Sequence, residues 1–187
     1  MRYVDEYRAP EQVLQLIGHL KTRAALLDYT AENPLRIMEV CGGHTHAIFK
    51  FGLDQLLPEN IEFIHGPGCP VCVLPMGRID SCIEIASQPD VIFCTFGDAM
   101  RVPGKNGSLL QAKARGADIR IVYSPMDALT LAEDNPARRV VFFGLGFETT
   151  MPATAITLQQ AKARGVGNFF FFCQHITLIP TLRSLLE

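Results

Sequence analysis

The chain has 187 residues, a length that suits one large domain or two small ones. Hydrophobic residues make up 48% and charged residues 19% of the sequence, which excludes an intrinsically disordered chain. The formal net charge is −2 and there is no basic cluster, which argues against nucleic acid or an anionic membrane as the main partner.

The N-terminus reads MRYVDEYRAPEQV, which is charged and lacks the apolar core of a signal peptide. No apolar run reaches the length needed to span a membrane. These features predict a cytoplasmic protein. In that compartment the six cysteines are reduced by default, so they indicate metal or redox chemistry before structural disulfides.

The predicted elements alternate between helix and strand. Residues 10–27 have helical spacing, with Val13, Ile17 and Ala24 on one face. Six apolar runs then predict strands, at residues 35–40, 61–65, 90–96, 119–124, 139–145 and 168–174. Because these runs are apolar almost throughout, they suit parallel strands that are covered on both sides. The sequence therefore predicts an α/β fold with parallel sheets and helices on both faces.

The hexapeptide QAKARG occurs at residues 111–116 and again at residues 160–165. Each copy ends a predicted helix that follows a strand and a glycine-containing loop. The final residues, Gly116 and Gly165, fit left-handed helix C-terminal caps. A six-residue identity without gaps favours internal duplication over convergence on a common βαβ pattern.

Duplication predicts two similar α/β lobes around a cleft, with a boundary near residues 133–139. The first lobe would comprise residues 1–135, and the second, incomplete lobe would comprise residues 136–187. Loops that follow parallel strands emerge at the carboxyl edge of a sheet, where ligands bind. Three loop motifs at such positions carry unusual residues.

The first motif is CGGHTH, residues 41–46, at the end of a predicted strand. Gly42 and Gly43 leave open space beside the sulfur of Cys41. A helix is predicted from Thr45 to Leu56, and the N-terminus of a helix favours a thiolate over a thiol. Cys41 is therefore a candidate nucleophile or ligand of a soft metal.

His44 and His46 lie two residues apart, so they share a face on a strand and diverge on a helix. One of them is a candidate metal ligand or proton donor beside Cys41. His44 is the preferred candidate because it lies nearer the turn. A role as a polar loop cap is an equally good interpretation.

The second motif is GPGCPVC, residues 66–72, which contains a C-x-x-C pair, Cys69 and Cys72. This spacing allows a redox dithiol or half of a four-ligand metal site. A closed zinc site needs a second pair that the sequence does not offer, so the redox interpretation is favoured. The other cysteines are expected to be small buried hydrophobic residues: Cys82, Cys94 and Cys173.

The third motif is GFETT, residues 146–150, which follows a predicted strand. Gly144 and Gly146 begin like a dinucleotide fingerprint, but Thr149 stands in place of the third glycine. Glu148 and the threonines either cap a helix or face the cysteines across a cleft. The candidate binding residues here are Gly146, Phe147, Glu148, Thr149 and Thr150.

Together and in this order, CGGHTH, GPGCPVC and GFETT closely resemble the motifs of the HypD family of hydrogenase maturation factors. The resemblance covers the whole chain. It implies a scaffold on which the iron of NiFe hydrogenases is assembled as Fe(CN)2CO, rather than a conventional turnover enzyme. The implied partners are a HypC-type chaperone, the cyanide donor HypE and, indirectly, the hydrogenase large subunit.

By this resemblance, Cys41 matches the iron-binding thiolate, while Cys69 and Cys72 match a redox-active pair beside the cleft. His44 is a possible further iron ligand. The other residues expected to line the cargo site are Gly42, Gly43, His46 and the GFETT loop. Full-length HypD proteins also carry a 4Fe-4S cluster on four cysteines in a later segment that this chain lacks. Because the chain also stops inside a predicted helix, we expect a fragment of a longer protein.

Two alternatives stand beside the scaffold. The chain could be a stand-alone thiol oxidoreductase that uses Cys69 and Cys72, or an inactive truncated fragment that only binds the partner chaperone. The scaffold is favoured over the oxidoreductase because only the scaffold gives Cys41 and its neighbouring histidines a role.

Overall fold

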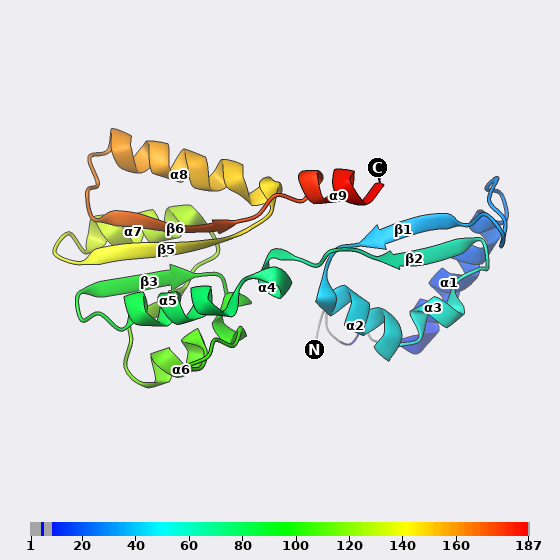
Figure 1. Cartoon of the computed structure of the whole chain (residues 1–187), viewed down its shortest axis with the longest axis horizontal. Helices are drawn as coiled ribbons and strands as arrows, with labels where there is room; N and C mark the ends of the chain where they lie inside the picture. The colour runs from blue at the N-terminus through cyan, green and yellow to red at the C-terminus, as the bar shows by residue number, and fades with distance from the viewer. Residues whose placement is uncertain (1–4, 6–8, 187) are drawn as a thin grey trace. The chain divides into compact units, whose positions relative to one another are not determined.

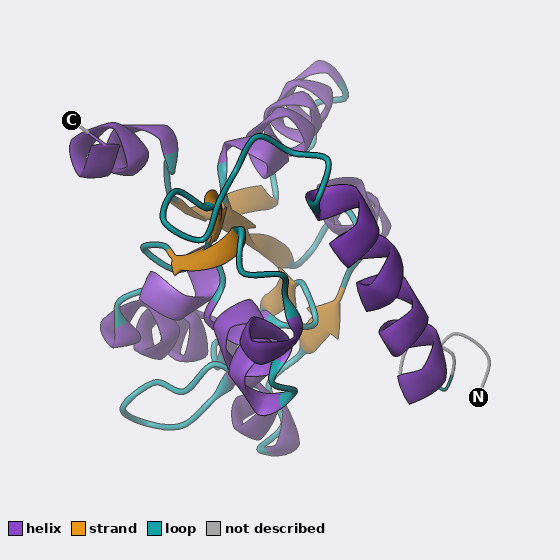
Figure 2. Ribbon diagram, turned by 90° about the vertical axis from the view of Figure 1, so that its right-hand side faces the viewer, coloured by secondary structure: helices purple, strands orange, loops and turns teal. Residues whose placement is uncertain are grey.

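The computed structural model describes Asp5 and residues 9–186, which form two units. Unit 1 comprises Met1–Gly68 and unit 2 comprises Cys69–Glu187. The described residues form helices and strands, drawn in purple and orange in Figure 2, and these mostly alternate along the chain. The sheets are parallel, so the predicted α/β class is confirmed. None of the helices in this part of the chain has the length and apolar character needed to cross a membrane.

Unit 1 contains a two-stranded parallel sheet in which Glu39 lies directly opposite His65. Its elements are α1 (Pro10–Ala24), β1 (Leu35–Glu39), α2 (Gly42–Lys50), α3 (Leu53–Leu56) and β2 (Ile61–His65). The single helix predicted from Thr45 to Leu56 forms as two helices. The chain breaks between them at Gly52, whose φ of 61° lies in the left-handed region.

Unit 2 contains a four-stranded parallel sheet with the order β4-β3-β5-β6. Its strands are β3 (Val91–Thr95), β4 (Ile119–Ile121), β5 (Arg139–Gly146) and β6 (Phe169–His175). Its α-helices are α4 (Pro70–Val73), α5 (Met76–Ala86), α6 (Leu109–Ala114), α7 (Pro125–Asp134), α8 (Met151–Ala163) and α9 (Ile179–Leu186). All six predicted strands are present in the two units. β4 is shorter than its apolar run because Ser124 caps the start of α7.

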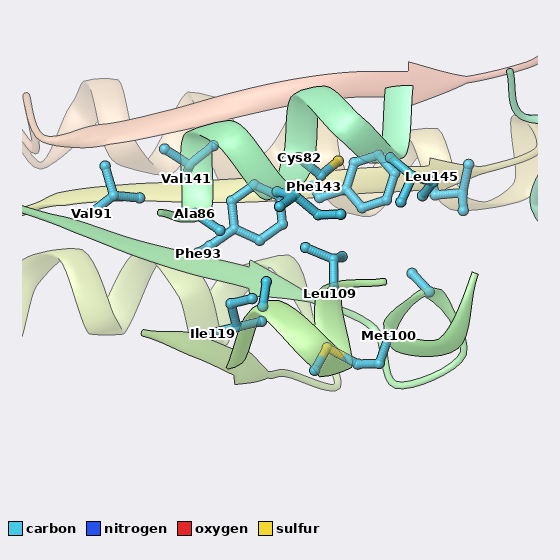
Figure 3. Close-up of a cluster of buried hydrophobic side chains, with 14 residues drawn as sticks. Cys82, Ala86, Val91, Phe93, Met100, Leu109, Ile119, Val141, Phe143 and Leu145 are labelled. Atoms are coloured by element: carbon cyan, nitrogen blue, oxygen red, sulfur yellow. The ribbon is translucent and has the colours of Figure 1, made fainter. Parts of the chain in front are cut away.

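Helices cover both faces of this sheet (Figure 1). On one face, Cys82 of α5 and Leu109 of α6 pack in an apolar core with Phe143 of β5 (Figure 3). On the other face, Ala128 of α7 packs in a second core with Phe142. Successive strand residues point to opposite faces, so a strand covered on both sides needs an unbroken apolar run. This explains the composition of the predicted strands.

The two copies of QAKARG end helices α6 and α8. Gly116 and Gly165, which follow these helices, have φ values of 104° and 69°, as predicted for C-terminal caps. Each helix leads from a central strand, β3 or β5, to an edge strand, β4 or β6. The repeat therefore corresponds to two βαβ halves of one sheet.

This arrangement corrects the predicted boundary near residues 133–139. That position lies between α7 and β5, and β5 pairs with β3, with Arg139 opposite Val91. The two halves of the repeat thus share one sheet, and the chain divides between Gly68 and Cys69 instead.

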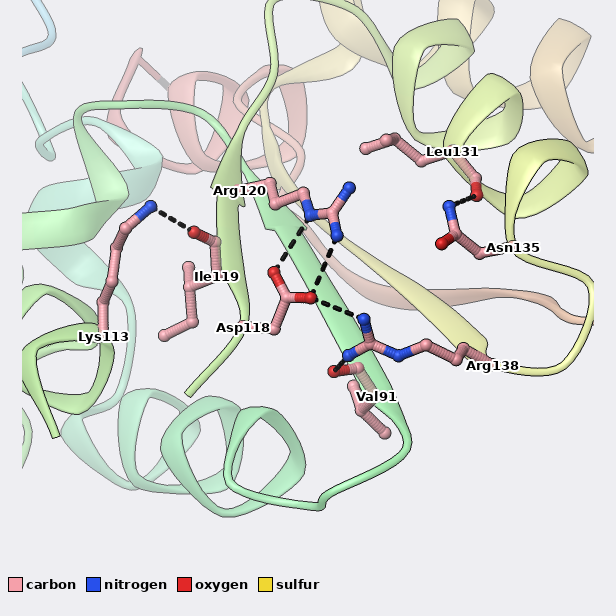
Figure 4. A network of polar contacts seen from close by, with 8 residues as sticks. All are labelled: Val91, Lys113, Asp118, Ile119, Arg120, Leu131, Asn135 and Arg138. Carbon is pink, nitrogen blue, oxygen red and sulfur yellow. Dashed lines mark hydrogen bonds and ion pairs between the residues drawn. The ribbon is translucent and has the colours of Figure 1, made fainter. Parts of the chain in front are cut away.

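A polar network joins three strands where they begin (Figure 4). Asp118, just before β4, accepts hydrogen bonds from Arg120 at 2.9 Å and from Arg138 at 2.7 Å. Arg138 also donates to the carbonyl oxygen of Val91 at 2.9 Å. These bonds hold the starts of β3, β4 and β5 together, at the edge opposite the strand-to-helix loops.

Candidate functional site

The Cys41 loop of unit 1 is the first candidate site. Cys41 has extended backbone angles and is the N-cap of α2, where its carbonyl accepts a hydrogen bond from the Thr45 amide at 3.0 Å. The cysteine is half-buried. A Cβ added to Gly43 would lie 3.5 Å from the Cys41 Sγ, so this glycine leaves the sulfur uncovered on one side. Gly42 is the first residue of the helix.

The carboxylate of Glu39 organises this loop. It accepts hydrogen bonds from the Cys41 amide at 2.8 Å and from the Thr45 hydroxyl, and lies 2.7 Å from Nδ1 of His65. Its side chain is only 9% exposed. The Thr45 hydroxyl, followed by His65 and the Cys41 amide, lowers the pKa of Glu39 to about 2. Glu39 is therefore an ionised carboxylate at neutral pH.

Glu39 was missed by the sequence analysis. One signal was available: a single acidic residue stands near the end of the mostly apolar run that leads to Cys41. Its partner His65 lies 26 positions later, and only the pairing of β1 with β2 brings the two side chains together.

His44 and His46 both lie in the first two turns of α2, and both are exposed. Positions two apart on a helix are rotated by about 200° from each other. The two imidazoles therefore point in different directions, and at most one of them can face the thiol of Cys41.

The C-x-x-C motif at the start of unit 2 is a second candidate site. Cys69 is the N-cap of α4 and Cys72 lies within this helix. Their Sγ atoms are 2.7 Å apart, with Cys69 half-buried and Cys72 exposed. A disulfide requires a sulfur separation of about 2.05 Å, so the pair can form one with a small movement. Val71 and Leu74 pack against the first apolar core, and α4 contacts β5.

The GFETT loop follows β5. Gly146 ends the strand, and a Cβ there would collide with the side chain of Thr150. The Thr150 hydroxyl donates to the carbonyl oxygen of Phe147 at 2.9 Å, while Thr149 is exposed. The loop is thus a tight turn whose conformation depends on the glycine.

Glu148 joins this loop to the end of the described chain. Its carboxylate accepts hydrogen bonds from the amides of Leu178 at 2.8 Å and Ile179 at 3.3 Å, at the start of α9. The Leu178 amide is the main cause of the lowered pKa of Glu148. Of the two interpretations of Glu148, the structure favours helix capping, although the capped helix is α9 and not the helix that follows directly.

Two of the other three cysteines behave as predicted. Cys82 and Cys94 are fully buried, and burial raises the pKa of each thiol to about 12, so both are neutral thiols. Cys173 is exposed, with its Sγ 3.8 Å from Nδ1 of His175, so its predicted burial is wrong. The reason is that Cys173 lies on β6, an edge strand of the sheet.

Comparison with known proteins gives consistent matches. Residues 13–187 match the family model described as "HypD: Hydrogenase formation hypA family". The chain is 87% identical to the hydrogenase maturation factor HypD of Escherichia coli (strain K12) and 60% identical to HypD of Rhodobacter capsulatus. It is 53% identical to HypD2 of Bradyrhizobium diazoefficiens. These alignments cover 100% of this chain and 50%, 50% and 48% of the relatives, so the chain spans about half their length.

Proposed function

The chain belongs to the HypD family, and from this premise we propose that it takes part in NiFe hydrogenase maturation as a scaffold that holds iron during assembly. The observation that carries this proposal is the Cys41 loop. A cysteine begins a helix, a buried carboxylate holds its backbone, and a glycine leaves its sulfur uncovered. This arrangement suits a thiolate that must accept and release a cargo.

In this proposal, Cys41 binds the iron, which is the cargo and not a resident cofactor. Thiolate sulfur is a soft donor and suits iron that carries cyanide and carbon monoxide, as in Fe(CN)2CO. Cys41 lies at the N-terminus of α2, directly before Gly42 and Gly43. His44, in the first turn of the same helix, is the candidate second ligand.

Cys69 and Cys72 supply thiol redox chemistry in this proposal. Closing the pair to a disulfide releases two electrons and two protons, which the proposed cyanide donor would take up as its ligand is released. The Gly66 amide donates to the Glu39 carbonyl oxygen at 2.8 Å, so the segment that leads to this pair begins beside the residue that ends β1, two positions before Cys41.

The proposed partners are a HypC-type chaperone that shares the iron, the cyanide donor HypE and, indirectly, the hydrogenase large subunit. The proposed place of action is the cytoplasm, where thiols stay reduced. A 4Fe-4S cluster is not assigned to this chain. Apart from the three cysteines of the two motifs, the described residues offer only the buried Cys82 and Cys94 and the edge-strand Cys173, which do not fit a four-thiolate site.

One observation favours a second candidate function. The C-x-x-C pair lies at the start of a helix with its sulfur atoms in contact, which also suits a stand-alone thiol oxidoreductase. Such an enzyme would need only Cys69 and Cys72. Its disulfide exchange with a small dithiol would survive the loss of Cys41.

The test is anaerobic co-purification of the chain with a HypC-type chaperone, followed by iron analysis and infrared spectroscopy of the cyanide and carbonyl stretches. Cys41→Ala is compared with the wild type, and Cys173→Ala is the matched control because it removes another accessible thiol. We expect iron with these bands in the wild type and the control, and its loss in Cys41→Ala. Equal iron in Cys41→Ala would overturn the proposal. A complex without iron in the wild type would show a chaperone-binding fragment only.

A further inference from the structure

We propose that Glu39 is a positioning residue for Cys41: its buried carboxylate, supported by His65, fixes the backbone from which the thiol presents itself to the iron. This inference deepens the proposed function and rests on it. Glu39 belongs to none of the three sequence motifs, and its role follows from the contacts of its side chain.

The two carboxylate oxygens of Glu39 have different partners. Oε2 accepts the amide of Cys41 at 2.8 Å, while Oε1 accepts the hydroxyl of Thr45 and lies 2.7 Å from Nδ1 of His65. Cys41 and Thr45 are the N-cap and the fourth residue of α2, so one carboxylate holds the whole first turn. A thiol on an unrestrained loop would sample many orientations. Iron binding would then cost the conformational entropy of that loop, which a fixed backbone avoids.

The pairing of β1 with β2 and the neighbouring contacts restrain Glu39 itself. It ends β1 directly opposite His65, the last residue of β2, so the two side chains share one face of the sheet. The Glu39 carbonyl also accepts the Gly66 amide, which begins the segment leading to Cys69. His65 is restrained in turn by Phe49, whose ring centroid lies 5.0 Å from the imidazole centroid. The pairing of the two strands therefore fixes the position of Glu39, and Glu39 in turn fixes the Cys41 loop.

The first readout needs no iron. Cysteine-selective ¹⁵N labelling gives signals from six residues, and the Cys41 amide is the one missing from Cys41→Ala. We expect Glu39→Ala to speed hydrogen exchange of this amide at least about tenfold, because the hydrogen bond to the charged carboxylate is lost. Glu62→Gln is the matched control, since Glu62 lies on β2 but is exposed and pairs with Arg36. Unchanged exchange in Glu39→Ala would overturn the proposal.

The second readout is iron retained in the chaperone complex. We expect Glu39→Ala to weaken the binding of iron about 10- to 100-fold, and Glu62→Gln to leave it unchanged. Glu39→Gln keeps one acceptor oxygen for the Cys41 amide. Its amide exchange and its iron binding should therefore both lie between those of the wild type and those of Glu39→Ala. Circular dichroism checks folding, and Glu39→Gln decides the matter if Glu39→Ala does not fold.

The two readouts separate the inference from its premise. If the wild type holds no iron, the scaffold function fails, while amide exchange still decides whether Glu39 positions Cys41. If Glu39→Ala loosens the amide but retains wild-type iron, Glu39 has only a structural role and the proposal is wrong.

Discussion

At the scale of single residues, the ends of β1 and β2 in unit 1 lie close together because Gly66 has no side chain. The Gly66 amide donates to the Glu39 carbonyl oxygen at 2.8 Å. A Cβ on Gly66 would lie 2.9 Å from that oxygen and 3.0 Å from the Cγ of Met38. Since the nearest atom belongs to the backbone, the contact cannot be relieved by turning a side chain.

We therefore expect Gly66→Ala to lower the free energy of unfolding by about 1–3 kcal/mol, the usual cost of forcing extra volume into a packed site. Gly18→Ala is the control, because nothing lies within 4 Å of its added Cβ inside α1. It should instead stabilise the chain by about 0.5–1 kcal/mol. Urea denaturation of both variants measures the difference, and equal effects would refute the steric argument.

At the scale of elements, strand ends and helix starts are held by carboxylates. Glu39 holds the start of α2, Glu148 holds the start of α9, and Asp118 holds the starts of three strands. Each of these carboxyl groups has a lowered pKa because its partners favour the charged form. The charged form of each group therefore stabilises the folded protein.

Asp118 gives a prediction on pH. Hydrogen bonds from Arg120, and then from Arg138, lower the pKa of Asp118 in the folded state. Its contribution to stability is therefore complete above its unfolded pKa of about 3.9 and is lost as the pH falls through the lower folded value. We expect Asp118→Asn to cost about 1–2 kcal/mol at pH 7, since these side chains are about one-third exposed.

The difference between wild type and Asp118→Asn should shrink when denaturation is measured below about pH 4. Asp90→Asn is the control, because the pair of Asp90 with Arg139 is about half exposed and screened by water, so its loss should change stability less than Asp118→Asn does. A difference that stays constant from pH 7 to pH 2 would contradict the assignment.

Glu148 gives a prediction on α9. In Glu148→Ala, the amides of Leu178 and Ile179 lose their acceptor, so their hydrogen exchange should become at least about tenfold faster. Glu133→Ala, which removes an exposed ion pair with Arg164, should leave these amides unchanged. Exchange resolved by NMR measures both variants. If the amides keep their protection in Glu148→Ala, the carboxylate is not what holds the start of the helix.

At the scale of the whole molecule, the apolar core is unevenly divided. Among the described residues, the buried hydrophobic side chains of unit 1 are Ala24, Ile48 and Ile61. The remaining ones belong to unit 2, where most of them form the two cores on either face of the four-stranded sheet. Because buried apolar area is the main source of stability, unit 2 should be the more stable unit.

Native-state hydrogen exchange followed by mass spectrometry should therefore show slow exchange in β3 and β5 and earlier exchange in β1 and β2. Ile48→Ala should speed exchange in unit 1 further, because truncating a buried isoleucine costs about 2–5 kcal/mol. It should leave β3 and β5 unchanged. Equal protection of β1 and β5 in the wild type would show that stability does not follow the division of the core.

The amino-acid sequence by itself determined the class of fold, the six strands and the family. These conclusions rest on local features: apolar runs of strand length, glycines after helices, and three motifs with unusual residues. Each feature can be recognised in the sequence without knowing which residues pack against it. The burial of Cys82 and Cys94 was also predictable, since both lie in apolar surroundings along the chain.

Only the tertiary structure decided which distant residues meet. Parallel pairing of β3 with β5 placed both repeats in one sheet, and pairing of β1 with β2 brought His65 to Glu39. The capping of α9 by Glu148 joins residues 30 positions apart, and the exposure of Cys173 follows from the edge position of its strand. These facts depend on strand order and register, which are set by the packing of the whole unit and not by the local pattern of residues.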